Sequence, residues 1–96
     1  MLEFPNQSRV FDSTRRAVHF WGHDSAIELS FFVNEDALRL VQPDMQPDED
    51  GFLRAFDSNR ALILATATKA YKRSRKPFYE LAANDFAKTG WLGRRL

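Results

Sequence analysis

The longest periodic pattern in the sequence is helical and runs from about Glu49 to Arg75. Its apolar residues recur at spacings of three, four or seven, and this stripe consists of Phe52, Phe56, Ile63, Ala67 and Ala70. We expect Asp48 to cap the helix, and Pro77 to end it by about Arg75, because a proline disfavours helical backbone in the residue before it. Such a helix would reach roughly 40 Å, which is long for one small domain, and the polar residues 57–59 favour a bend.

The first third of the chain has strand patterns. Alternation from Ala26 to Val33 predicts a strand, with residues 27, 29, 31 and 33 on a fully buried face and residues 26, 28, 30 and 32 on a mixed face. A strand is also expected at 17–21, followed by a hairpin loop at 22–25. The turn residues 12–15 separate that strand from a short apolar run at Val10 and Phe11, which predicts a first hairpin.

Later segments complete the expected order of elements. Asn34 is placed to cap a short helix with acidic residues in its first turn, and the proline-containing segment 42–50 is expected to be a loop. A last strand is predicted at 78–81, followed by a turn of helix that Asn84 or Asp85 caps and that ends near Gly90. The pattern predicts an α+β fold, in which a small antiparallel sheet of three N-terminal strands and one late strand packs a short and a long helix on one face.

Length and composition restrict the classes of protein further. The 96 residues are expected to form a single domain over 1–96, with a polar N-terminal arm at 1–8 and a C-terminal tail at 91–96. The absence of cysteine excludes disulfides and thiolate metal sites and fits a reducing compartment, so we expect a cytoplasmic protein. No apolar run has the ~20 residues that cross a bilayer. Fourteen basic against thirteen acidic residues do not indicate a dedicated nucleic-acid binder.

The mixed face of the sheet is the first candidate for a partner surface. It is expected to carry His19, Trp21, Glu28 and Phe32. If helices cover only the other face, these rings are exposed and indicate a protein partner or a second copy of the chain. The alternative, given equal weight, is that the C-terminal tail with Trp91 and Leu92 folds over them.

A basic run near the end of the long helix is the second candidate surface. It consists of Lys69, Lys72, Arg73, Arg75 and Lys76, and Arg94 and Arg95 or Arg15 and Arg16 would extend it. Such a patch can contact the phosphates of a nucleic acid. Cations at a helix C-terminus also complement the helix dipole, and this simpler interpretation is favoured.

Catalytic and metal-binding patterns are weak. His19, His23 and Asp24 are the concentrated set of metal ligands, but they span a strand end and a turn, where they are not expected to converge. Ser25 or Ser30 with a histidine would be needed for a nucleophile, and there is no nucleophile elbow or phosphate-binding glycine loop. We therefore expect no cofactor and no metal, and regard an enzyme as the less favoured reading.

Three polar residues interrupt otherwise apolar patterns. Asn59 and Arg60 lie within the long helix, and Asp85 lies near the end of the chain. Buried polar groups need partners, so Arg60 is expected to pair with an acid such as Glu80 or Asp85, or to lie over an aromatic ring. These residues are the candidate buried polar network.

Motifs along nearly the whole chain resemble one known family. They are Phe4-Pro5, Phe11-Asp12, Val18-His19-Phe20-Trp21-Gly22-His23-Asp24, Phe31-Phe32-Val33, Asp36-Ala37-Leu38, Ala55-Phe56-Asp57-x-Asn59-Arg60, Tyr79-x-Leu81 and Asp85-Phe86. The pattern is similar to that of the small bacterial domain-of-unknown-function family fourteen-eighty-eight (DUF1488). The resemblance implies a stand-alone bacterial α+β domain and brings no assigned activity or site residue.

Overall fold

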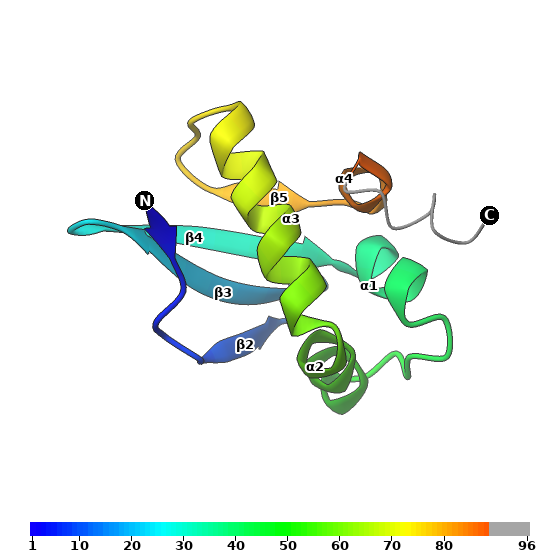
Figure 1. The fold of residues 1–96 in the computed structure, drawn as a ribbon. Helices are drawn as coiled ribbons and strands as arrows, with labels where there is room; N and C mark the ends of the chain where they lie inside the picture. Colours follow the sequence, from blue (N-terminus) through cyan, green and yellow to red (C-terminus); the bar gives the residue numbers. More distant parts are fainter. Residues whose placement is uncertain (89–96) are drawn as a thin grey trace.

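A computed structural model of the chain describes residues 1–88, which form a mixed five-stranded sheet with four helices packed on it (Figure 1). The strands are β1 (Leu2–Glu3), β2 (Arg9–Asp12), β3 (Ala17–Asp24), β4 (Ile27–Asn34) and β5 (Tyr79–Leu81). The helices are α1 (Glu35–Val41), α2 (Glu49–Ser58), α3 (Arg60–Arg73) and α4 (Ala83–Lys88). The expected α+β class is confirmed.

The sheet is built around the antiparallel hairpin of β3 and β4, which pairs residues from Ala17↔Asn34 to Asp24↔Ile27. Both β1 and β2 pair antiparallel with β3, so β3 carries two short strands along one edge. The late strand β5 pairs with β4 in the parallel direction, which corrects the expectation of a wholly antiparallel sheet. The chain between β4 and β5 contains three helices, which is long enough for the crossover that a parallel pair requires.

The N-terminal part of the sheet is longer than its polar composition predicted. Leu2 and Glu3, expected in a polar arm, pair with Asp24 and His23 at the end of β3. The loop expected at 22–25 narrows to Ser25 and Ala26, and Ser25 has a left-handed φ of 56°. Gly22 lies within β3, and its missing side chain makes room for the N-terminal segment, because a Cβ there would lie only 2.9 Å from the ring of Phe4.

The helix caps follow the sequence. The Asn34 side chain accepts a hydrogen bond from the amide of Ala37 at 3.0 Å, and Asp48 accepts one from the amide of Gly51 at 2.8 Å. The long helical pattern is divided into α2 and α3 at Asn59, whose side-chain amide donates to the carbonyl of Ala55 at 2.8 Å. The bend expected at 57–59 is therefore a break between two helices, and α3 ends at Arg73, in agreement with the expected end by about Arg75.

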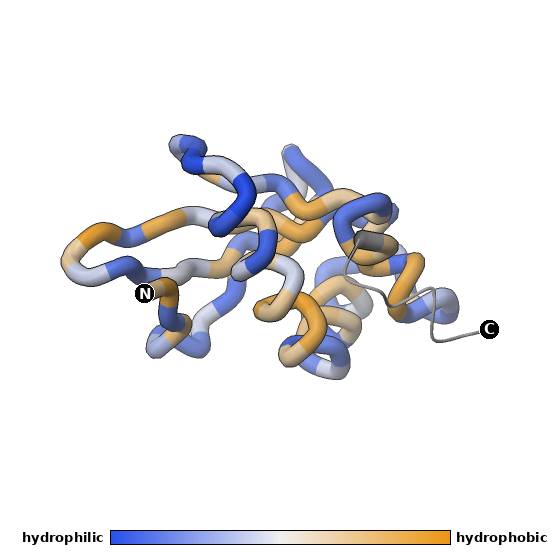
Figure 2. Tube along the Cα trace, turned by 45° about the horizontal axis from the view of Figure 1, so that its top comes forward, coloured by the Kyte–Doolittle hydropathy of each residue, from blue (hydrophilic) through white to orange (hydrophobic). Residues whose placement is uncertain are grey.

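One core lies between the sheet and the helices. Its largest fully buried side chains are Phe20, Phe31, Phe52, Phe56, Phe86, Leu38, Ile63, Leu81, Val18 and Val33. Hydrophobic segments lie on both the strands and the helices, and the chain is hydrophilic where α3 ends (Figure 2). Within residues 1–88, no helix combines the length and apolarity needed to cross a membrane. The expected end of the last helix at Thr89 and Gly90, and the tail 91–96, fall outside the described residues.

Candidate functional site

The face of the sheet turned away from the helices is built by alternate residues of β3 and β4. The register places His19 opposite Phe32, Trp21 opposite Ser30, and His23 opposite Glu28. Because successive side chains of a strand point to opposite faces, these six residues share one side of the sheet. Residues of the other parity, such as Phe20 and Phe31, belong to the core. We call the first side the open face, since α3 crosses the opposite side in Figure 1.

The centre of the open face is a stack of three rings. The imidazole of His19 lies 4.2 Å from the ring centroid of Trp21 and 4.2 Å from that of Phe32. Its Nε2 atom is 3.0 Å from the hydroxyl of Ser30. Partial burial in this stack lowers the pKa of His19, with Arg15 acting in the same direction and Asp12 and Glu28 opposing it. The imidazole is therefore biased toward its neutral form.

Phe32 is more buried than an uncovered sheet predicts. It is 6% exposed because the His19 ring stacks on it, the Arg15 guanidinium lies 4.4 Å from its centroid, and Phe78 meets it edge-on at 5.9 Å. The apolar surface that remains open comes from Trp21, which is half-buried, and from Val10 and Phe78, which are 52% and 42% exposed. The alternation of residues along the strands did not predict that Arg15 belongs to this face, because Arg15 lies in the turn before β3.

Carboxylates surround the stack. Glu28 is exposed, with its Oε2 atom 3.6 Å from Nε2 of His23. Glu80 pairs with Phe32 in the β4–β5 ladder and accepts a hydrogen bond from Asn34 at 3.2 Å. Arg15 is the cation over the rings, and its Nε is 3.7 Å from Asp12. The open face therefore combines an aromatic centre with a mainly acidic rim.

The histidines do not assemble the cluster that their spacing with Asp24 suggested. His19 and His23 share the open face, whereas Asp24 has the opposite parity and accepts a hydrogen bond from the hydroxyl of Tyr71 on α3. Among residues 1–88, no group of three or more histidine or acidic side chains is arranged to hold a metal ion. His19 and Ser30 do form a close pair. A nucleophile would also need an acid that orients the base, and among residues 1–88 the His19 ring makes no hydrogen bond to a carboxylate.

The basic run is divided between different surroundings. Arg73 donates to Asp85 at 3.2 Å, and the guanidinium of Arg75 lies 4.0 Å from the ring centroid of Tyr71. Lys69, Lys72 and Lys76 are exposed. The structure thus leaves the lysines facing solvent and engages the two arginines, which are also exposed, in local contacts. The extension to Arg94 and Arg95 lies outside the described residues.

The three residues of the expected polar network each bind different partners. Asn59 donates to Gln42 at 3.1 Å, while Arg60 lies 4.8 Å from the centroid of Phe56 and its Nη2 atom is 3.4 Å from Asp57. Arg60 thus lies over an aromatic ring and also pairs with an acid, as expected, but that acid is Asp57 rather than Glu80 or Asp85. Asp85 instead binds Arg73 and accepts from the amide of Ala82 at the start of α4.

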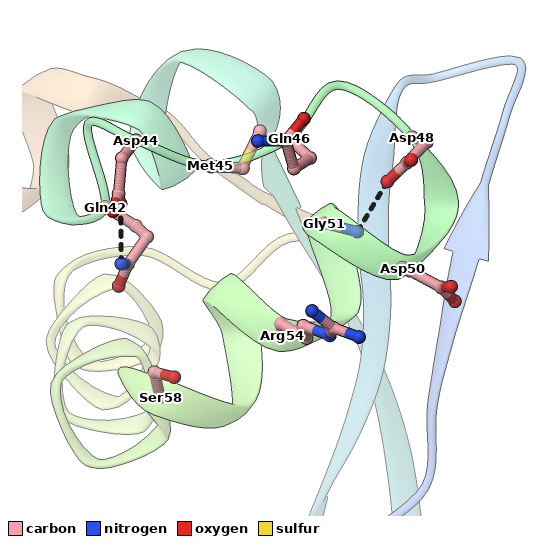
Figure 3. Close-up of a pocket in the computed structure, with 9 residues that line it drawn as sticks. All are labelled: Gln42, Asp44, Met45, Gln46, Asp48, Asp50, Gly51, Arg54 and Ser58. Carbon is pink, nitrogen blue, oxygen red and sulfur yellow. Dashed lines mark hydrogen bonds between the residues drawn. The ribbon is translucent and has the colours of Figure 1, made fainter.

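A polar cleft of about 410 Å³ lies beside the start of α2. Its lining comes from the loop after α1 and from α2, and Figure 3 shows Gln42, Asp44, Met45, Gln46, Asp48, Asp50, Gly51, Arg54 and Ser58. The Asp48 carboxylate caps α2, and the Asp44 carboxylate accepts a hydrogen bond from the side-chain amide of Gln42 at 2.8 Å. These contacts stabilise the loop and account for Asp44 and Asp48 without a ligand.

Fold and site together define a small α+β domain whose most distinctive surface is an aromatic, acid-rimmed sheet face. The family model described as "Protein of unknown function (DUF1488)" matches residues 2–82. The chain therefore belongs to the DUF1488 family, as its motifs indicated.

A solved structure has the same fold. The crystal structure of a protein of unknown function from the DUF1488 family of Shewanella loihica PV-4 superposes with a TM-score of 0.74. The two sequences are 16% identical, and the match covers 83% of this chain and 90% of the other. No curated protein matches the chain. The comparisons establish the fold and the family, and they assign no activity.

Proposed function

We propose that this protein is a non-enzymatic binding module that engages a protein partner through the open face of its sheet. The observation that carries the proposal is the stack of His19 with Trp21 and Phe32 on the side of the sheet opposite α3. Aromatic side chains with apolar neighbours are enriched at protein interfaces, and Trp is a frequent energetic centre of such surfaces. Val10 and Phe78 extend the apolar area on either side.

The charges on this face favour a protein over a nucleic acid. A sheet that stacks bases must also attract the phosphates that join them. Here Glu28 and Glu80 lie at the rim, and the guanidinium of Arg15 is already placed over Phe32. The acidic rim repels phosphates and is compatible with a partner that brings cations to the edge of the aromatic area.

A second copy of the chain meets this requirement. Along β4 the open face presents the Arg15 guanidinium over Phe32 and then, beyond Ser30, the carboxylate of Glu28. A two-fold axis that lies in the interface and crosses the strands reverses this order in the partner. Arg15 of each copy is then brought toward Glu28 of the other, while the Trp21 rings meet near the axis. Such a self-complementary surface is the requirement for a symmetric dimer.

Sedimentation over a range of protein concentrations tests the proposal. We expect the wild-type mass to rise toward that of a dimer, and Trp21→Ala to shift the association to higher concentration by at least tenfold, as for a central aromatic residue. Ile27→Ala is the matched control, because Ile27 is 64% exposed and lies on the other face of the sheet. It should associate like the wild type.

Charge exchange tests the orientation. Arg15→Glu alone and Glu28→Arg alone should each weaken the dimer, because each brings like charges together across the interface, and the double variant should restore it. A monomeric wild type at millimolar concentration contradicts the dimer. Binding of a nucleic acid that depends on Lys69, Lys72 and Lys76 would instead assign function to the end of α3. We also propose a bacterial, cytoplasmic protein, in keeping with the family resemblance and the absence of cysteine.

A further inference from the structure

A groove of about 420 Å³ lies on the helix side of the sheet, away from the open face. Leu2 and Asp24 line it from the ends of β1 and β3, and Tyr71, Lys72 and Arg75 line it from the end of α3 and the residues after it. Its volume is within the range of small-molecule sites in proteins. The groove is independent of the proposed dimer surface, because Asp24 and the ring stack lie on opposite faces of β3.

The acidic group of the groove is already bound. The Asp24 carboxylate accepts a hydrogen bond from the Tyr71 hydroxyl and lies 2.9 Å from the amino group of Met1. These contacts hold the Tyr71 ring in place as one wall and match the negative charge of Asp24. No other carboxylate lines the groove in the part of the chain that the structure describes.

Two cations remain at its edge. Arg75 is held in position because its guanidinium lies 4.0 Å from the centroid of the Tyr71 ring and its Nη1 atom donates to the Tyr71 carbonyl at 2.5 Å. A guanidinium has five N–H donors, so most of them stay free for a ligand. Lys72 is exposed and, among residues 1–88, its side-chain ammonium makes no hydrogen bond or ion pair. The groove thus joins apolar walls with an excess of positive charge.

We propose that this groove binds a small organic anion with an apolar body. A carboxylate or phosphate group would contact Lys72 and Arg75, which supply charge-assisted donors, and the apolar part would lie against Leu2 and the ring of Tyr71. The Tyr71–Asp24 bond and the Arg75 contacts are made within the protein and hold the walls and one cation in position, which reduces the cost of binding.

Titration of ¹⁵N-labelled protein with octanoate, followed by NMR, tests this site. We expect the largest amide shifts at Leu2, Asp24 and residues 68–75, with smaller shifts for inorganic phosphate, which lacks the body, and for octanol, which lacks the charge. Lys72→Gln and Arg75→Gln should each weaken octanoate binding about tenfold, the loss expected for one charge-assisted hydrogen bond. Lys69→Gln is the matched control, because Lys69 is an exposed lysine of α3 that does not line the groove.

Three outcomes would overturn the assignment. They are the absence of shifts at millimolar octanoate, shifts centred on the Trp21 face, and equal affinities for the Lys72→Gln, Arg75→Gln and Lys69→Gln variants. If inorganic phosphate binds as tightly as octanoate, the apolar part of the ligand contributes nothing to binding, which contradicts the proposal. Amide spectra of each free variant verify that the fold is retained, so a loss of binding is distinguished from unfolding.

Discussion

The hydroxyl of Tyr71 donates a hydrogen bond to the carboxylate of Asp24, which joins the end of α3 to the end of β3. The two residues are 47 positions apart in the sequence. The bond stabilises the ionised carboxylate and is the main reason that the pKa of Asp24 lies below its usual range, with the Met1 amino group adding to the effect. It also holds the Tyr71 ring where it separates the core from the groove.

Tyr71→Phe is expected to raise the pKa of Asp24 toward its ordinary value. A carboxylate whose pKa is lower in the folded state contributes stability above its unfolded pKa, about 3.9, and loses that contribution as the pH falls through the lowered folded value. The variant should therefore be less stable than the wild type at pH 7, and the difference should narrow in acid. Carboxyl NMR titration and urea unfolding at several pH values measure both effects. An unchanged pKa of Asp24 would contradict this role of Tyr71.

Gly51→Ala is expected to destabilise the protein although Gly51 lies within a helix. Alanine usually favours a helix over glycine by about 1 kcal/mol. Here a Cβ would lie 2.0 Å from the carbonyl oxygen of Gln46, and this oxygen belongs to the backbone, so the loop before α2 must move. We expect a loss of about 2 kcal/mol, typical of overpacking, in chemical unfolding. Asp50→Ala, an exposed neighbour, is the control and should change stability far less.

The ion pair between Arg9 and Asp57 should contribute a measurable but small coupling energy. Two donors of Arg9 contact the two carboxylate oxygens of Asp57 at 2.8 and 2.7 Å, which joins β2 to α2. The Asp57 side chain is 45% exposed, so solvent screens the pair. A double-mutant cycle with Arg9→Met and Asp57→Asn should give about 0.5–1 kcal/mol, decreasing in high salt. A coupling that is zero in low salt would show that the geometry adds no stability.

Much of the fold follows from local patterns. The alternation in 26–33 predicts β4, and Asn34 and Asp48 cap the helices that follow them. The predicted antiparallel pairing of β5 was wrong, because a strand of three residues contains no signal that distinguishes parallel from antiparallel pairing. The break at Asn59 was only partly predictable. The Asn59 side chain also donates a hydrogen bond to Gln42 from another segment, and such a contact has no local pattern in the sequence.

The candidate sites depended on where β3 ends. Placing a loop at 22–25 grouped Asp24 with the two histidines, whereas continuing the strand to Asp24 puts this residue on the opposite face. The error arose at Gly22, because glycine followed by polar residues is typical of a turn when the local sequence is considered alone. Only glycine fits at this position of the strand, because Phe4 and Leu2 occupy the space beside it. Such a contact with a distant segment has no local pattern in the sequence.

His19 is expected to make the stability of the fold depend on pH near neutrality. Burial in the stack lowers its pKa, so the folded state takes up a proton less readily than the unfolded state, whose histidine has a pKa of about 6.5. Stability should therefore be independent of His19 well above this value and should decrease as the pH falls through 6.5 toward the lowered pKa. Urea unfolding at pH 7.5 and 5.5 should show a smaller decrease for His19→Gln than for the wild type, and His23→Gln separates the contribution of the second histidine. Because Trp21 and Phe32 both contact the His19 ring, equal decreases in the wild type and His19→Gln would mean that the stack does not exclude water from the imidazole.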